Sequence, residues 1–252
     1  MTTLLAARNL VAGYLPGIDI LQGVSVDGVR GQVRCILGPN GTGKSTLLKV
    51  LFGLIPPRAG EIHLAGDLLR GASPHTMGRR GVAYLPQRPS VFPFLSVEVN
   101  LRLGTWSYRR MPGRVEDSVQ RAFERFPILW EKRRQPAGTL SGGQQRQLEV
   151  ARSLMTDPGL ILVDEPTASI EPRVAAQTYA LIKELAVAGK AVLLVDQNIR
   201  GALEIADYVY VMRTGALLTE GPRGEFRGDT EALVARWLYA SDRTAGQAEG
   251  GH

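Results

Sequence analysis

The segment Gly38–Thr46, with the sequence GPNGTGKST, constrains this chain more than any other feature. It matches the pattern G-x-x-x-x-G-K-[ST] and lies between a short apolar run, Val33–Leu37, and leucines at helical spacing. Glycines let such a loop turn tightly, so that backbone N–H groups and a helix start face one anion. The pattern predicts a strand, a phosphate-binding loop and a helix, although a loop that merely turns is the alternative. The candidate binding residues are Gly38, Pro39, Asn40, Gly41, Thr42, Gly43, Lys44, Ser45 and Thr46.

Within that loop, two side chains have distinct expected tasks. Lys44 should reach the β- and γ-phosphates of a nucleotide, and Ser45 should ligate Mg²⁺ through its hydroxyl oxygen.

Two acids follow another apolar run, Leu160–Val163. This arrangement predicts a buried strand that delivers both carboxylates to its carboxyl end, where open α/β sheets bind ligands. We expect Asp164 to hold Mg²⁺ through water, and Glu165 to orient and activate the attacking water as the catalytic base. A solvated acidic turn is the alternative, and the phosphate-loop pattern disfavours it.

A second helix start with anion-binding character is predicted at Leu140–Gln144, with the sequence LSGGQ. Ser141 is the expected N-cap, and the apolar residues after it recur at helical spacing. The start of a helix presents free N–H groups and the positive end of its dipole. The candidate residues are Ser141, Gly142, Gly143 and Gln144. The alternative is an ordinary capped helix.

Short apolar runs alternate with helical patterns, which is typical of an α/β fold. Leu160–Val163 and Ala191–Val195 are continuous apolar runs, as in parallel strands that are buried on both faces. Tyr208–Met212 and Ala216–Thr219 flank Thr214-Gly215, which predicts a hairpin.

Three helices are expected from apolar spacing. One begins at Pro172 and carries Val174, Thr178, Leu181 and Leu185 on one face. Another ends at Pro127 and has an apolar face of Val115, Val119, Ala122, Phe123 and Phe126. The last is capped by Asp229 and carries Leu233, Val234 and Trp237, with a frayed tail from Ser241 onward.

Composition excludes several classes of protein. With 252 residues, 44% of them apolar, the chain can bury a core, and a single cysteine, Cys35, permits no internal disulfide. We expect neither a membrane span nor a signal peptide, because the longest stretch without Asp, Glu, Lys or Arg is short and polar. The net charge is +6, and residues 101–134 hold nine Lys/Arg against four acids. This basic segment could be a solvated helical face, a surface for anionic lipid, or a nucleic-acid patch.

The phosphate loop, the LSGGQ helix start and the Asp-Glu strand, in this order, resemble the ATP-binding subunit of ABC transporters. The resemblance covers roughly residues 4–239 and implies a P-loop α/β fold: a RecA-like core with an antiparallel β subdomain. It places one ATPase domain at residues 1–240, with a helical subdomain inserted at about 88–150, and a disordered tail at 241–252. It also implies ATP and Mg²⁺ as cofactors and ATP hydrolysis as the activity.

The resemblance further implies partners and a location. Two ATPase subunits, alike or different, would hold each ATP between one subunit's phosphate loop and the other's Ser141, Gly142 and Gly143. Transmembrane permease subunits would bind the helical subdomain at the cytoplasmic face of the membrane, and a solute-binding protein outside would act indirectly. Nucleic acid is not expected as a partner.

Three further residues match positions of the family. Tyr14 stands where an aromatic ring stacks on adenine, and Gln87 where a glutamine senses Mg²⁺, so the implied metal set is Ser45, Gln87 and Asp164. Gln197 stands where most members have a histidine. It can donate a hydrogen bond to a γ-phosphate, but it does not titrate near pH 7. Each could instead be a core or loop residue.

Val195-Asp-Gln-Asn198 resembles the ATPases of importers for branched-chain amino acids and related amides. The sequence Ala168–Glu171 departs from both patterns, because common members have Asp where Glu171 stands and the importer type usually has a short apolar run. The alternative class is a soluble ATPase of the same type that acts on nucleic acid or the ribosome, or as an assembly factor. The pI of about 9.7 favours it, but the chain holds one cassette, and the 97 positions from Lys44 to Ser141 leave no room for long coiled coils.

Overall fold

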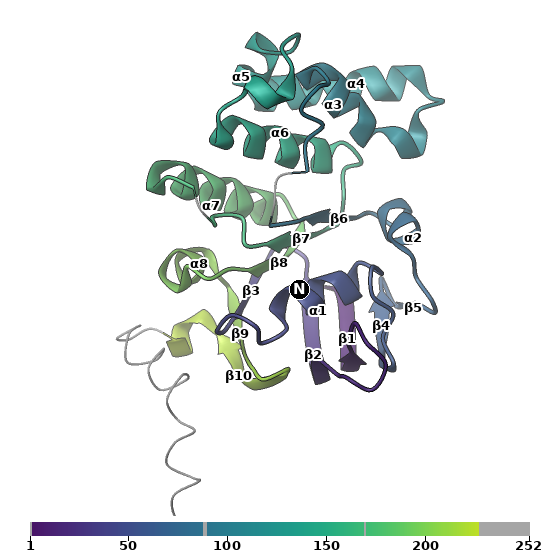
Figure 1. Cartoon of the computed structure of the whole chain (residues 1–252), viewed down its shortest axis with the longest axis vertical. Coiled ribbons are helices and arrows are strands. Elements are labelled where there is room, and N and C mark those ends of the chain that lie inside the picture. Colours follow the sequence, from purple (N-terminus) through teal and green to yellow (C-terminus); the bar gives the residue numbers. More distant parts are fainter. Residues whose placement is uncertain (1, 88–89, 169, 227–252) are drawn as a thin grey trace, which may run out of the picture.

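The computed structural model describes residues 2–87, 90–168 and 170–226. A six-stranded sheet crosses the middle of the molecule, with a four-stranded antiparallel sheet at one end and helices α3 to α6 at the other (Figure 1). The predicted helix at Asp229 and the tail from Ser241 lie outside the described residues. The part of the chain that is described contains no helix with the length and apolar character needed to cross a membrane.

The six-stranded sheet has the order β10-β9-β3-β8-β7-β6. Every neighbouring pair is parallel except the hairpin of β9 and β10. Its strands are β3 (Val33–Leu37), β6 (Val82–Leu85), β7 (Leu160–Asp164), β8 (Ala191–Val195), β9 (Tyr208–Arg213) and β10 (Ala216–Pro222). All five residues of β7 and of β8 are buried, as their apolar runs predicted.

The antiparallel sheet has the order β2-β1-β4-β5. Its strands are β1 (Thr3–Ala12), β2 (Leu21–Val29), β4 (Ala59–Leu64) and β5 (Asp67–Leu68). The predicted hairpin turn is confirmed between β9 and β10, where Thr214 and Gly215 have φ angles of 47° and 78°. Positive φ at both central residues is what a tight hairpin turn requires.

Two apolar cores lie on opposite faces of the six-stranded sheet, because alternate residues of a strand point to opposite sides. Ile36 packs with α1 and the antiparallel sheet, whereas Cys35 and Leu37 pack with the helices of the other face. Cys35 is fully buried, and its Sγ lies 3.4 Å from the carbonyl oxygen of Ala202. The central sheet is thus covered on both sides, and its carboxyl edge is left for the loops.

The helices are α1 (Lys44–Leu51), α2 (Pro74–Arg79), α3 (Val97–Gly104), α4 (Pro112–Arg125), α5 (Pro127–Glu131), α6 (Gly142–Leu154), α7 (Pro172–Val187) and α8 (Ile199–Ile205). Short 3-10 turns cover Trp106–Tyr108, Ala137–Thr139 and Arg223–Phe226. The apolar face predicted for α4 is buried throughout. Of the face predicted for α7, Thr178 and Leu185 are buried, whereas Val174 and Leu181 are half-buried beside a hollow next to α6, and the buried face also includes Ala175 and Ile182.

Candidate functional site

Four loops meet at the carboxyl edge of the parallel strands. The loop after β3 is Gly38–Gly43, and the strands β6, β7 and β8 are followed by Gln87, Glu165 and Gln197. Together they line a hollow of about 350 Å³. The residues that line it are Ile20, Asn40, Gly41, Gly43, Lys44, Ser45, Thr46, Gln87, Glu165 and Gln197.

The phosphate-loop segment wraps closely around the start of α1. Gly43 is the N-cap of α1 with a φ of 96°, and no side chain caps this helix. At Gly38 a Cβ would lie 2.2 Å from the carbonyl oxygen of Met212, so only glycine fits there. The N–H groups of the first turn of α1 are therefore free of side-chain acceptors, which is the arrangement that binds phosphate.

Lys44 is buried, and its Nζ donates to the carbonyl oxygens of Gly38 and Pro39 at 2.8 Å each. Burial lowers the pKa of the Lys44 ammonium, and the nearby carboxylates of Glu165 and Asp164 oppose that shift. A cation held between a glycine-rich loop and these acids is well placed to meet polyphosphate.

Asp164 and Ser45, both expected at the metal, lie together. Ser45 Oγ donates to Asp164 Oδ1 at 2.8 Å, and the hydroxyl of Tyr84 donates to Oδ2 at 3.0 Å. The described residues contain no group of three His, Cys, Asp or Glu side chains that could cage a metal. Mg²⁺ is usually held by one or two carboxylates together with substrate phosphates, so this oxygen pair fits Mg²⁺.

Glu165, the expected catalytic base, accepts two amide hydrogen bonds on one oxygen. Gln87 Nε2 donates to its Oε2 at 2.6 Å, and Gln197 Nε2 donates to the same atom. Glu165 is buried and has a φ of 44°, and its backbone N–H donates to Val195 at 2.8 Å. A non-glycine residue in the left-handed region is a strained feature that clusters at functional sites. The structure thus brings together three residues that were predicted separately.

A buried polar network behind Gln197 was not predicted. Asp196 is 2% exposed, and its carboxylate accepts from the hydroxyls of Thr167 and Tyr179 and from the backbone N–H of Asn198. Burial raises the pKa of Asp196, and these hydrogen bonds oppose the rise. The network fastens the segment after Glu165 to the segment after β8. The only sequence signal for it was an acid directly after an apolar strand.

Tyr14 is 55% exposed and lies beside α1, where its hydroxyl accepts from Lys49 Nζ at 3.2 Å. Tyr14 is not among the residues that line the hollow. Its side chain contacts that of Thr46 in the first turn of α1, and Thr46 does line the hollow. An exposed ring at the rim of a phosphate site is suited to stacking on a flat base.

The second predicted helix start is present at α6. Ser141 Oγ accepts from the N–H of Gln144 at 3.4 Å, and Gln144 Oε1 accepts from the N–H of Ser141 at 3.1 Å. This is a closed capping box. Ser141, Gly142, Gly143 and Gln144 do not line the hollow. The structure therefore keeps this helix start apart from the chain's own phosphate loop.

Several cations of the basic segment 101–134 are engaged within the chain. Arg102 pairs with Glu98 and Glu116, at 3.0 and 2.9 Å. Arg109 and Arg133 stack on tryptophan rings, with guanidinium carbons 4.4 and 3.8 Å from the ring centroids. Part of the positive charge thus has a local structural use.

The comparisons with known proteins agree with this geometry. A sequence model of the family described as ABC transporter matches residues 21–168. The probable branched-chain amino acid transport ATP-binding protein LivF of Archaeoglobus fulgidus is 37% identical over 223 residues, 88% of this chain and 93% of that protein. The lipopolysaccharide export system ATP-binding protein LptB of Escherichia coli K12 is 34% identical over 227 residues, 89% and 93% of the two chains. A solved nucleotide-free ATP-binding cassette from an ABC transporter has a TM-score of 0.79 at 28% identity, covering 99% of this chain and 100% of the other.

Proposed function

The chain belongs to the ABC transporter family and is an ATPase subunit of a transporter, and we propose that it powers the import of branched-chain amino acids or related amides. One observation carries the ATPase assignment of the site. A carboxylate, Glu165, is held by two amides at the edge of a hollow whose other wall is the phosphate loop. The similarity to LivF and the Val195–Asn198 segment support the solute class.

In the proposed reaction the protein works by positioning and by electrostatics. The loop N–H groups and Lys44 bind the phosphates of ATP. Mg²⁺, held by Ser45 and Asp164 with Gln87 nearby, would neutralise phosphate charge. Glu165 accepts a proton from water as that water attacks the γ-phosphorus, while the bond to the bridging oxygen of the β-phosphate breaks and ADP leaves. Gln197 donates a hydrogen bond to the γ-phosphate.

Two subunits complete each site in this proposal. Tyr14 stacks on the adenine of the chain's own ATP, while Ser141, Gly142, Gly143 and Gln144 meet the ATP of a second subunit. The separation of the α6 start from the chain's own hollow supports this arrangement.

The permease partner is proposed to bind beside α3 and α6. A hollow of about 390 Å³ lies there, lined in part by Phe92, Trp106 and Arg152. Phe92 is 49% exposed and Trp106 is 60% exposed, and exposed apolar side chains that gather around one hollow are typical of an interaction surface. We place the chain at the cytoplasmic face of the membrane, as a peripheral subunit.

The test is purification of the tagged full chain from native membranes, with a Lys44→Ala chain as the matched control. We expect two multi-spanning proteins and a second ATPase, and ATP hydrolysis that the Lys44→Ala complex lacks. Uptake of labelled leucine that depends on Lys44 would establish the solute class. Recovery with lipopolysaccharide would replace import by export, and recovery with ribosomes or nucleic acid would overturn the transport function.

A further inference from the structure

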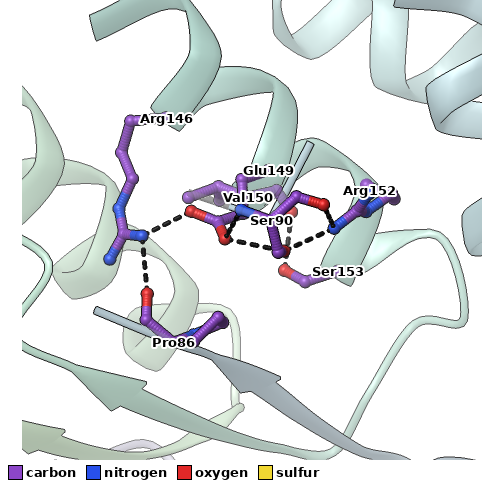
Figure 2. A network of polar contacts seen from close by, with 7 residues as sticks. All are labelled: Pro86, Ser90, Arg146, Glu149, Val150, Arg152 and Ser153. Carbon is purple, nitrogen blue, oxygen red and sulfur yellow. Dashed lines mark hydrogen bonds and ion pairs between the residues drawn. The ribbon is translucent and has the colours of Figure 1, made fainter. Parts of the chain in front are cut away.

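Side chains of helix α6 form hydrogen bonds with Pro86 and Ser90, which follow β6 in the sequence (Figure 2). Arg146 Nη1 donates to the carbonyl oxygen of Pro86 at 3.0 Å. Glu149 Oε1 accepts from both the backbone N–H and the hydroxyl of Ser90, at 2.9 Å each. Arg152, one turn further along α6, donates through Nη2 to the carbonyl oxygen of Ser90 at 2.7 Å. Pro86 and Ser90, which come before and after Gln87 in the sequence, are therefore both held by side chains of α6.

Arg146 and Glu149 form a buried ion pair. Arg146 is 4% exposed and Glu149 is 2% exposed, and Arg146 Nη1 also contacts Glu149 Oε2. Nε and Nη2 of Arg146 find no hydrogen-bond partner within the described part of the chain. A buried pair with unmet donors contributes little net stability compared with apolar side chains of similar size. Its contribution is geometric, because Arg146 is bound to Glu149 and to Pro86, and Glu149 is bound to Arg146 and to Ser90.

Gln87 directly follows Pro86, and its amide reaches Glu165 at 2.6 Å. We propose that Arg146 and Glu149 are positioning residues for Gln87, which hold Pro86 and Ser90 against α6 and so fix the amide that contacts the catalytic carboxylate. This inference rests on the proposed function, which places Gln87 and Glu165 at the reacting phosphate.

The same helix starts at the residues proposed to bind the second subunit's ATP. Arg146 comes only four positions after Gly142, about 6 Å along the helix axis, so the intervening turn moves as one rigid piece. A displacement of the α6 start is therefore carried to Pro86 and Ser90, and from there to Gln87. The ion pair links the chain's own ATP site to the one that it completes on its partner.

The test is a double-mutant cycle in the full chain assembled with its permease. Arg146→Met/Glu149→Met removes the contacts of this pair with Pro86 and Ser90 without leaving one charge buried, while Arg152 keeps its own contact with Ser90. Gln87→Ala removes the amide. We expect each to lower kcat by about 10- to 100-fold, the cost of a misplaced catalytic contact, with ATP affinity within about twofold of wild type. The combined variant should be no slower than the slower parent, because both changes act through one group.

A second readout needs no turnover. In the nucleotide-free full chain, hydrogen exchange at the Ser90 amide should be faster in Arg146→Met/Glu149→Met than in wild type, since that N–H loses its acceptor. Ser90→Ala, which removes only the hydroxyl contacts, should fold normally and lower kcat by a few-fold. Ser153→Ala is the control, because Ser153 lies on the same helix and its hydroxyl, among the described residues, bonds only to the carbonyl oxygen of Val150 at 2.7 Å.

The outcomes separate the two proposals. A slow Gln87→Ala enzyme beside a normal Arg146→Met/Glu149→Met enzyme, or fully additive effects, would overturn the positioning role alone. A normal Gln87→Ala enzyme would remove Gln87 from the reaction and so overturn the positioning role, whereas loss of ATP hydrolysis from the wild-type complex would overturn the proposed function. Unchanged hydrogen exchange at the Ser90 amide would contradict the hydrogen bond from Ser90 to Glu149 on which the positioning role depends. This test applies even to a chain without measurable ATP hydrolysis.

Discussion

Helices α1 and α6 both begin at glycine-rich segments, but their N-termini are capped differently. The start of α1 has Gly43 as its N-cap, without a side-chain acceptor, and is covered by a loop that also holds Lys44. The start of α6 has Ser141 as its N-cap and closes on itself through Gln144. A helix dipole is common to both, so the dipole alone does not make a binding site. A binding site also needs the surrounding loop and a cation, and of these two helices α1 has both.

Gly142 indicates the role of the N-terminus of α6. A Cβ there would meet nothing within 4 Å, and its φ is not in the left-handed region. Glycine is a poor helix residue compared with alanine, so the chain itself gains nothing from it. The space above Gly142 is consistent with close approach by a group from outside the chain, as the proposed dimer requires.

The largest effect that would sharpen this comparison is expected at Glu165. Glu165→Gln should lower turnover by about 10²- to 10⁴-fold, the usual cost of losing a general base. ATP binding should persist, so that ATP accumulates in a dimer in which the α6 start meets the partner's nucleotide. Sedimentation with and without ATP measures the dimer. Near-normal hydrolysis would remove Glu165 from the base role.

Lys44→Ala should break the α1 site and leave the α6 start intact. A hydrogen bond to a charged group contributes about 1.5–3 kcal/mol, so ATP affinity of the single chain should fall by about 10- to 150-fold. Isothermal titration measures the loss, and a normal thermal midpoint is the control for folding. Undiminished affinity would mean that the two helix starts differ less than their surroundings suggest.

Gln197→Ala should have a smaller effect, because it removes one neutral donor while Gln87 still holds Glu165 Oε2. A net value of about 0.5–1.5 kcal/mol for such a bond predicts turnover lowered by about 2- to 12-fold, with nucleotide binding retained. Steady-state kinetics of the assembled transporter provide the measurement. Unchanged turnover would exclude Gln197 from the switch role.

Gly142→Ala should have the smallest effect on the chain itself. Stability should be unchanged or higher by about 0.4–1 kcal/mol, because alanine restricts the unfolded chain and fits the helix without strain. Single-chain ATP affinity should equal that of wild type, while turnover of the dimer falls. Chemical denaturation and turnover are the two measurements. Normal turnover would show that nothing approaches Gly142 closely.

Most of the site was predictable because its signals are local. The phosphate loop, the Asp-Glu strand end and the LSGGQ helix start each lie within a few consecutive residues, and period-two and period-3.6 patterns supplied the strands and helices around them. The structure confirms these elements, including the N-cap at Ser141 and the hairpin at Thr214-Gly215. The residue roles at the site stay predictions until variants are measured.

The contacts between distant segments were not predictable. Ser90 and Glu149 are 59 positions apart, and nothing in either neighbourhood marks them as partners. Tyr84 on Asp164 and Tyr179 on Asp196 are similar cases, in which a tyrosine hydroxyl donates to a buried carboxylate far away in the sequence. Such pairs depend on how the elements pack. The partial exposure of Val174 and Leu181 on α7 has the same origin, because tertiary packing selects the buried face.

The chain's single cysteine has a consequence for experiments. Burial raises the pKa of the Cys35 thiol, and its sulfur is fully covered on β3, so neither the thiolate nor access to it is available for reaction. The native protein should resist alkylation and mild oxidation without losing its fold. New cysteines placed at exposed positions, such as beside the α6 start, can therefore carry spectroscopic labels in an otherwise unaltered chain, and distances between two labelled subunits can be followed directly.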